Sequence, residues 1–346
     1  MTWRPAFSRR ISLRHFSAAA LLLPVFFAGC ATSGGSSAFG PGAPGAGSPL
    51  DLYLNGELQV EKGQLDLAIA SLSDAIAKNP HMDLAYQARG EVYKQKGAYE
   101  SAALDFKHVT EAEPYNFKAT YELGLMYQYL KRFGEAVAAY QHAVEMRPLD
   151  KSANMNLALV YTQMGEPLRG LPYAQRAASS GDDAAAEANL GTLYSQSGYS
   201  SLAIAAYKKS IELDGRQPQV YTNLAQEYLQ AGEYALARNT LETASNIAPS
   251  PAVSERLGLT YYKLKDYPKA RHAFEDALRQ NASYFQALNG LGVLSMTQSL
   301  GATPADLEAA RQALAFWNHS LQIQPNQPVI RELIEKYTGT AQSPAK

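Results

Sequence analysis

Residues 117–150 read FKATYELGLMYQYLKRFGEAVAAYQHAVEMRPLD. An aromatic residue, Tyr127, lies three positions after Gly124, and a second small residue, Ala136, lies twelve positions after it. Two antiparallel helices can approach closely only where small side chains face each other, so we expect two helices that cross at Gly124 and Ala136. Pro148 cannot continue a helix and closes the unit.

The same pattern recurs along the chain from residue 49 onward. A glycine or alanine returns about every 34 residues, at Gly56, Gly90, Gly124, Ala158, Gly191, Ala225, Gly258 and Gly292. The aromatic residue three positions later is present in six of these eight units, as Tyr93, Tyr127, Tyr161, Tyr194, Tyr228 and Tyr261. Runs of β-branched residues with period-2 alternation are absent, so the sequence predicts helices and no sheet.

Residues 49 to 325 resemble an array of tetratricopeptide repeats, a family of helix-turn-helix units with a period of about 34 residues. The resemblance implies an all-α fold, a right-handed superhelical α-solenoid of about eight repeats. The expected repeats span about residues 49–82, 83–116, 117–150, 151–183, 184–217, 218–250, 251–284 and 285–325.

The last repeat of such an array needs a cover, because each unit leaves an apolar face that its neighbour buries. We expect a capping helix at residues 326–338, followed by a disordered tail at residues 339–346. The residues expected to face the array are Val329, Ile330, Leu333 and Ile334.

Two repeats depart from the pattern. In repeat four, Pro172 falls inside the second helix, where it should remove a backbone hydrogen bond, whereas Pro167 stands at a helix start. This junction is a candidate for a kink or a weak interface, and neutral sequence drift is the alternative. Repeat eight carries about seven extra residues. We expect them to lengthen the connection and the second helix, with Thr303 as the helix cap and Pro304 as its first residue.

Residues 1–29 have the layout of a signal peptide. A basic segment with four arginines and no acidic residue precedes an apolar stretch at residues 16–28, which is too short to span a bilayer comfortably. The sequence FAGC at residues 27–30 resembles the lipobox of bacterial lipoproteins, with phenylalanine where leucine is usual. The resemblance implies acylation of Cys30. Because Ala31 follows instead of aspartate, it also implies an outer-membrane lipid anchor facing the periplasm.

Alternatives remain open for this N-terminal segment. It also has features of an ordinary signal peptide, which would give a soluble periplasmic or secreted protein, and of a mitochondrial presequence. Residues 8–14 resemble a twin-arginine export signal as well. Residues 30–50 are expected to form a flexible tether, since Gly, Pro, Ser and Ala make up nearly all of the segment after Cys30.

Charge and reactive residues argue against several classes of function. Without residues 1–30 the chain has 27 basic and 32 acidic residues, so it lacks the excess of positive charge that is typical of nucleic-acid-binding proteins. Cys30 is the only cysteine, which excludes an intramolecular disulfide and a thiolate metal cluster. No two of the six histidines are four residues apart, and no HExxH, GxSxG or GxxxxGK motif occurs. We therefore expect no enzyme, cofactor, metal site or small-molecule substrate.

Binding residues are expected on the concave surface, which the first helix of each repeat lines in this family. An asparagine recurs there in three successive repeats, at Asn156, Asn189 and Asn223. This resembles the asparagine ladder of O-linked N-acetylglucosamine transferase, which implies a grip on the backbone of an extended peptide. A side-chain amide can donate and accept at once, so it matches a peptide unit without reading its side chain. The alternative is that each asparagine only bonds the neighbouring helix.

Further concave positions surround these asparagines. Tyrosine and methionine offer broad contact area and glutamine offers adaptable hydrogen bonds, a mixture that suits protein ligands. Ordinary solvated helix surface is the alternative for this set. Its members are Tyr121, Gln128, Tyr129, Met155, Gln163, Gln196, Gln226, Gln230 and Tyr262.

The sequence thus predicts a non-catalytic envelope scaffold that binds extended polypeptides or partner subunits. The first hypothesis is assembly of a pilus or secretion complex, by resemblance to repeat lipoproteins of pilus biogenesis and secretin assembly. An adaptor for cell-wall hydrolases or proteases is the second. A partner in polysaccharide export or of a glycosyltransferase is the third.

Overall fold

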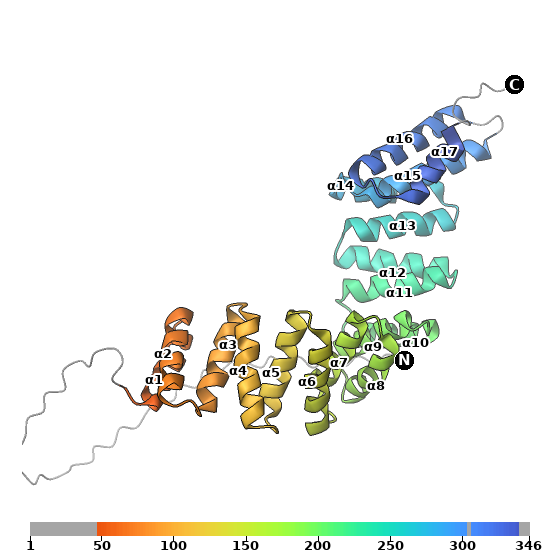
Figure 1. Ribbon diagram of the computed structural model, residues 1–346. Helices are drawn as coiled ribbons and strands as arrows, with labels where there is room; N and C mark the ends of the chain where they lie inside the picture. Colours follow the sequence, from red (N-terminus) through yellow and green to blue (C-terminus); the bar gives the residue numbers. More distant parts are fainter. Residues whose placement is uncertain (1–46, 303–305, 339–346) are drawn as a thin grey trace, which may run out of the picture. The chain divides into compact units, whose positions relative to one another are not determined.

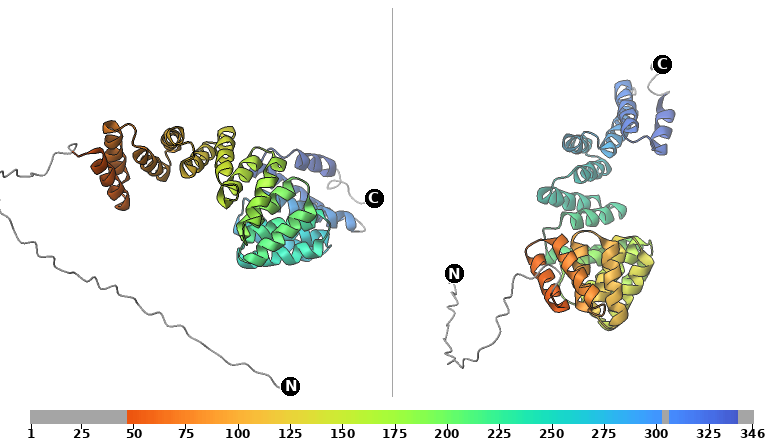
Figure 2. Two further views of the ribbon diagram at one scale, coloured as in Figure 1. Left: turned by 90° about the horizontal axis from the view of Figure 1, so that it is seen from below. Right: turned by 60° about the vertical axis from the view of Figure 1, so that its left-hand side comes forward.

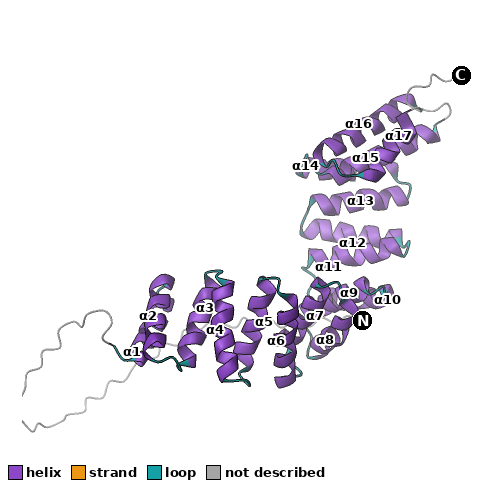
Figure 3. Ribbon diagram, viewed as in Figure 1, coloured by secondary structure: helices purple, strands orange, loops and turns teal. Residues whose placement is uncertain are grey.

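The computed structural model describes residues 47–302 and 306–338. In this part of the chain the secondary structure consists of seventeen α-helices. Figure 3 shows helices joined by loops, without a strand, in the described residues. The expected signal peptide, Cys30, most of the expected tether and the C-terminal tail lie outside the described residues.

Sixteen of these helices form eight pairs in chain order, one pair in each repeat (Figure 1). The first helices are α1 (Pro49–Glu61), α3 (Asp83–Gln95), α5 (Phe117–Tyr129), α7 (Lys151–Gln163), α9 (Ala184–Gln196), α11 (Pro218–Gln230), α13 (Pro251–Lys263) and α15 (Phe285–Gly301). The second helices are α2 (Leu65–Lys78), α4 (Tyr99–Ala112), α6 (Phe133–Met146), α8 (Pro167–Ser179), α10 (Ser200–Leu213), α12 (Tyr234–Ile247), α14 (Tyr267–Gln280) and α16 (Leu307–Ile323). A single helix, α17 (Pro328–Thr338), follows.

Each helix packs against the next one in the chain, and the first helices of several successive repeats also touch. Figure 2 shows this stacking of neighbouring pairs from two further directions. The buried side chains form a chain of small clusters, several of them shared by adjacent repeats, and not one central core. All-helical repeats stacked in this way form an α-solenoid, as the sequence predicts.

Helix α1 begins within the segment that we expected to be tether. The Ser48 hydroxyl accepts the backbone N–H of Asp51, and the Asp51 carboxylate accepts the Ser48 backbone N–H at 2.9 Å. This reciprocal pair is a capping box, and Pro49 at the first helical position suits it. The helix therefore starts at Pro49, whereas the tether was expected to extend to residue 50.

The two helices of a repeat cross at the small residues. Where the small residue of the first helix is glycine, the side chain that faces it from the second helix is large. A Cβ at Gly124 would lie 2.8 Å from the ring of Tyr140, and one at Gly191 would lie 2.7 Å from the ring of Tyr207. Real Cβ atoms do not approach that closely, so only glycine admits these aromatic rings at the crossing. Further glycines that face large side chains are Gly56 (Leu72), Gly90 (Phe106), Gly258 (Phe274) and Gly292 (Trp317).

In repeats one to seven the turn between the two helices uses a residue in the left-handed conformation. Five repeats place glycine there, with φ between 71° and 80°. Lys131 and Lys265 take the same conformation, with φ of 58° and 62°. At Lys131 the turn closes because the Arg132 N–H donates to the Tyr127 carbonyl at 2.8 Å. A residue with a Cβ is strained in this region by about 1–2 kcal/mol.

Helix α8 of repeat four is continuous from Pro167 to Ser179, with Pro167 in its first turn and Pro172 in its interior. Pro172 does not break the helix, and α8 contacts both α7 and α9. Gly170 is the close-contact residue of this repeat. A Cβ there would lie 2.9 Å from the Ala158 carbonyl oxygen and 2.8 Å from Leu193 Cδ2.

Repeat eight differs from our expectation in where the extra residues go. Helices α15 and α16 have 17 residues each, against 13 or 14 in the helices of the other repeats. The insertion therefore lengthens the first helix as well as the second. Asp306 is the N-cap of α16, since its carboxylate accepts the N–H groups of Glu308 and Ala309 at 3.0 Å. The expected start near Thr303, which lies outside the described residues, was wrong because this carboxylate caps the helix at Leu307.

Helix α17 covers the end of the array with one side only. Ile330 is buried, and Leu333 and Ile334 pack against the cluster around Trp317. Val329 is 65% exposed, so its expected inward orientation was wrong. Ile330, Leu333 and Ile334 share one helix face, and Val329 precedes that face by one residue, about 100° around the helix.

Candidate functional site

A pocket of about 720 Å³ lies between α5 and α7 on the side formed by the first helices. It brings together four side chains that the sequence placed on the concave surface: Gln128, Tyr129, Asn156 and Gln163. Four further side chains line it that sequence reasoning missed: Leu125, Lys131, Phe133 and Leu159. Leu125 and Leu159 occupy the same position of successive repeats, one after the glycine or alanine, so the repeat alignment could have identified them.

A chain of hydrogen bonds runs beneath this pocket. Asn156 Nδ2 donates to the Tyr121 hydroxyl at 2.8 Å and to the Tyr140 hydroxyl at 3.3 Å. Tyr140 donates to Gln128 Oε1 at 3.1 Å, and Gln128 Nε2 donates to Gln163 Oε1 at 3.1 Å. Burial raises the pKa of Tyr121 and of Tyr140, so both phenols keep their protons at neutral pH. The Nδ2 group of Asn156 is therefore engaged by two phenol oxygens of the preceding repeat.

The other two asparagines have different surroundings. Asn223 Oδ1 accepts Gln219 Nε2 at 2.9 Å. Burial raises the pKa of the Tyr207 phenol, and hydrogen bonding to Thr192 and Asn223 opposes that rise. The half-buried amide of Asn189 has no hydrogen-bond partner among the residues that the structure describes. Asn189 is thus the asparagine of the series in which both the side-chain oxygen and the side-chain nitrogen lack a bond to the described residues.

Glutamines form a second row of amides on the same three helices. Gln163, Gln196 and Gln230 are exposed, and each follows its asparagine by seven residues on the same helix. Seven residues are two helical turns, or about 10 Å along the helix axis. Gln226 is half-buried and lies between the two rows on α11. Helices α7, α9 and α11 therefore present two parallel rows of side-chain amides.

The other side chains predicted for the concave surface, two tyrosines of repeat three, Met155 and Tyr262, differ in how far they are exposed. Tyr129 is 52% exposed and stacks on Tyr99 with ring centroids 4.5 Å apart, whereas Tyr121 is half-buried. Met155 packs against the buried cluster of repeats four and five. Tyr262 shares a hydrogen bond of 3.0 Å with a threonine of α15. Only Tyr129 of these four predicted residues offers a broad exposed aromatic surface.

The amide surface carries no charge of its own. Each of its three helices has one charged residue, and each of these is engaged elsewhere. Lys151 pairs with Asp183, and Glu187 pairs with Lys209 at 2.5 Å. Glu227 is buried and accepts two serine hydroxyls at 2.5 Å. A neutral surface of amides suits a neutral polar ligand such as a polypeptide backbone.

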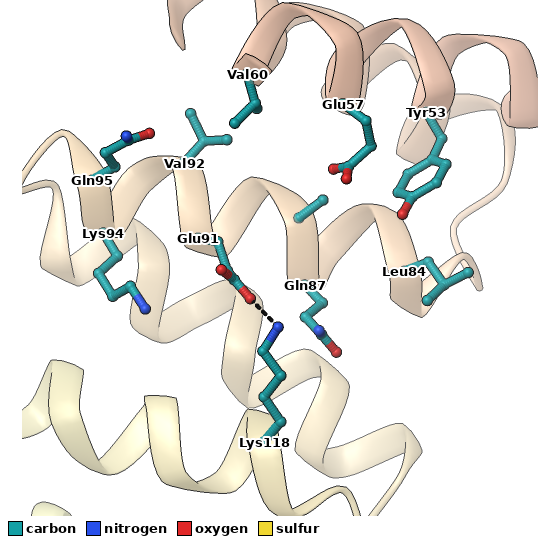
Figure 4. A pocket seen from close by; sticks show the side chains of 11 residues that line it. Tyr53, Glu57, Val60, Leu84, Gln87, Glu91, Val92, Lys94, Gln95 and Lys118 are labelled. Carbon is teal, nitrogen blue, oxygen red and sulfur yellow. Dashed lines mark ion pairs between the residues drawn. The ribbon is translucent and has the colours of Figure 1, made fainter. Parts of the chain in front are cut away.

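The first repeats present a different surface. A pocket of about 610 Å³ lies between α1 and α3, with Lys118 of α5 at its edge. Figure 4 shows Lys118 Nζ paired with Glu91 Oε1, at 2.5 Å, with Glu57 and Tyr53 facing them from α1. The mixture of acidic and basic groups here contrasts with the neutral surface of α7, α9 and α11.

Within the described residues, no group of three His, Cys, Asp or Glu side chains is placed to hold a metal ion. A search of the same residues for helices with the length and apolarity needed to cross a bilayer found none.

Solved structures share the fold of this chain at low sequence identity. The Cut9–Hcn1 hetero-tetramer of the APC/C is 17% identical, with a TM-score of 0.52 over 83% of this chain and 55% of that one. The C-terminal part of a TPR repeat-containing protein from Cytophaga hutchinsonii is 17% identical, with a TM-score of 0.59 over 69% of this chain and 99% of that one. PilW, a type IV pilus biogenesis factor, is 18% identical, with a TM-score of 0.52 over 59% of this chain and 95% of that one.

The chain thus spans about half the length of the Cut9–Hcn1 chain that it matches. No match was found among curated proteins. A sequence model of the tetratricopeptide repeat matches residues 53–117, 121–189 and 255–320, and a second model of that description matches residues 188–217 and 218–251. Together these matches cover more than half of the chain, so it belongs to the tetratricopeptide repeat family.

Proposed function

We propose that this protein is a non-catalytic scaffold that holds an extended polypeptide on the first-helix side of repeats three to six. Tetratricopeptide repeat proteins in general mediate protein–protein interaction. The observation that carries the proposal is the neutral surface of two amide rows on α7, α9 and α11, beside the pocket at Asn156. Peptide backbone presents one donor and one acceptor per residue, which side-chain amides can match in pairs.

The binding mode follows from which amides are free. Asn189, Gln196 and Gln230 make no internal hydrogen bond among the described residues, so they are the groups that meet the polypeptide backbone. Asn156 supports the pocket between α5 and α7 from below through Tyr121. That pocket takes an apolar side chain of the same polypeptide, because its walls include the apolar and aromatic side chains of Leu125, Tyr129, Phe133 and Leu159.

Site-specific photo-crosslinking in the host cell tests this proposal. A photoreactive residue at Gln196 should crosslink to a polypeptide, and replacing Asn189 and Gln230 with alanine should reduce that crosslink severalfold. The matched control places the photoreactive residue at Asn318, an exposed amide on α16, and combines it with Gln322→Ala. Equal crosslinking at Asn318, or an unchanged crosslink in the double variant, would show that the amide rows do not bind the polypeptide.

The place of action that we propose is the outer membrane, with the protein anchored through an acylated Cys30 and facing the periplasm. The lipobox-like residues 27–30 support this location. Loss of palmitate labelling and of membrane association in Cys30→Ser tests it, and a labelled variant would exclude the anchor. A soluble periplasmic or secreted form is the alternative.

The pathway that we propose is the assembly of a pilus or secretion complex. Its support is the combination of a lipobox-like sequence with a repeat array of the fold that PilW also has. Adaptors for cell-wall hydrolases or proteases, and partners of polysaccharide export or of a glycosyltransferase, are the alternatives. Identifying the protein crosslinked at Gln196 by mass spectrometry distinguishes these pathways.

A further inference from the structure

A separate hollow of about 430 Å³ lies between α13 and α15, in repeats seven and eight. Its walls include the apolar side chains of Leu259, Phe274 and Val293 and the polar side chains of Glu255 and Asn289. It shares no residue with the amide surface or with the pocket at Asn156.

Repeat eight has Gly290 at the position that the asparagine series occupies in repeats four to six, and Gly290 lines the hollow. A Cβ at Gly290 would overlap the ring of Phe274. No other residue type therefore fits this position without displacing that ring. The ring of Phe274 thus occupies the space that a side chain at Gly290 would need, and it forms the base of the hollow, with Leu259, which is 37% exposed, at its side.

One acceptor group, the Glu255 carboxylate, lines this hollow without a donor from the described residues, whereas the Asn289 side-chain oxygen is enclosed. The half-buried carboxylate of Glu255 makes no hydrogen bond or ion pair among them, and burial raises its pKa. Its neighbour Arg256 opposes that rise, but the Arg256 guanidinium donates to the Thr222 carbonyl at 3.2 Å. Asn289 Nδ2 donates to Gln327 at 2.7 Å, whereas Asn289 Oδ1 is buried with no partner. A buried acceptor left without a donor is unfavourable.

We propose that this hollow binds the side chain of a lysine on a partner polypeptide. The ammonium group meets the Glu255 carboxylate. The methylene stem lies along Leu259 and Val293, as long basic side chains do when their stem is buried on apolar surface. An ammonium supplies up to three donors, and a donor is the group that the Glu255 carboxylate lacks among the described residues.

Two cations of the protein stand near the hollow and oppose this binding. Lys263 is exposed and lines the opening, and Arg256 lies beside Glu255. The Arg256 guanidinium is held by the preceding repeat, whereas the exposed Lys263 side chain can turn into solvent. The charges of Glu255 and Lys263 therefore act in opposite directions on a bound lysine, and this gives the proposal two opposite tests.

The first test titrates the full chain, labelled at leucine and valine methyl groups, with the methylamide of lysine acetylated at its α-amino group, so that the side-chain ammonium is free. The Leu259 and Val293 methyl signals should shift and saturate. N-acetyl-norleucine methylamide has a stem of similar length but no ammonium, and it should bind at least about fivefold more weakly. Equal binding of the two compounds would overturn the proposal, because it would show that the hollow binds only the apolar stem and not the ammonium group.

The second test changes the charges around the hollow. Glu255→Gln should weaken lysine binding by about tenfold or more, and Lys263→Met should strengthen it by about two- to threefold. The matched control is Glu275→Gln, an exposed carboxylate on α14, which should leave binding unchanged. Unchanged lysine binding in Glu255→Gln, in a variant whose helicity and melting match the parent, would overturn the proposal. None of these results depends on the amide rows.

Discussion

Repeats three and four lie on either side of the pocket at Asn156, and they form their helix crossings in different ways. Repeat three places Gly124 against Tyr140, a ring that is fully buried. Repeat four has Ala158 and Ala174 at the equivalent positions, and its glycine, Gly170, stands on the second helix. The crossing is preserved in both because the space taken by the two side chains together is limited, whichever helix supplies the glycine.

The difference between the two repeats decides what the next asparagine can do. Tyr140 of repeat three carries a hydroxyl that accepts Asn156 Nδ2, and Asn223 lies close enough to Tyr207 of repeat five to oppose the rise in the pKa of its phenol. Repeat four has alanine there, so Asn189 of repeat five meets no phenol. A substitution in the second helix of one repeat thereby frees an amide on the first helix of the next.

The largest expected effect is that of Tyr140→Ala, which gives repeat three the small residue of repeat four. We expect the free energy of unfolding to fall by about 3–5 kcal/mol, because a buried ring is lost and Gly124 leaves the cavity unfilled. Denaturant unfolding followed by far-UV circular dichroism measures this change. Tyr115→Ala, at a tyrosine that is 86% exposed, is the control and should change stability by less than about 0.5 kcal/mol. Similar losses in the two variants would contradict the packing described for Tyr140.

An intermediate effect is expected from Gly124→Ala, which gives repeat three the alanine that repeat four has at its crossing. The added Cβ would lie 2.8 Å from the Tyr140 ring, so we expect a loss of about 1–3 kcal/mol from overpacking. The same unfolding measurement applies. In repeat four, Ala158→Gly should cost about 1–2 kcal/mol, through helix propensity and the loss of a buried methyl group. A stabilising Gly124→Ala would show that the crossing has more room than the contacts indicate.

The smallest expected effect is in the turn between the helices of each repeat. Lys131 has a left-handed backbone with φ of 58°, where repeat four has Gly165 with φ of 75°. Lys131→Gly should therefore raise the free energy of unfolding by about 0.5–1 kcal/mol, and Gly165→Lys should lower it by a similar amount. Thermal unfolding of the two variants measures both changes. A destabilising Lys131→Gly would mean that the lysine side chain contributes more to the pocket edge than the turn strain costs.

The sequence predicted well what depends on residues close together in the chain. The spacing of Gly124, Tyr127 and Ala136 places two helices and their crossing, because those positions recur on one face of each helix. The expectation failed where a boundary depended on one side chain. The Asp306 carboxylate sets the start of α16, and one position around a helix separates exposed Val329 from buried Ile330.

The candidate site was less predictable. The asparagine series was visible in the sequence at Asn156, Asn189 and Asn223. No sequence pattern indicated that Asn156 is held by two phenols, or that Asn189 is free. The partners of Asn156 are Tyr121 and Tyr140, on two helices of the preceding repeat, and their reach depends on how the repeats pack.

By itself, then, the amino-acid sequence determined an array of eight helix pairs and the rows of amides along it. Its repeat period and its small residues act within each repeat, where neighbours in sequence are neighbours in space. Only the tertiary structure decided which amides are free, and it alone showed the hollow above Phe274 at Gly290. Both features arise where side chains from different helices compete for one space, and no single repeat contains all of those side chains.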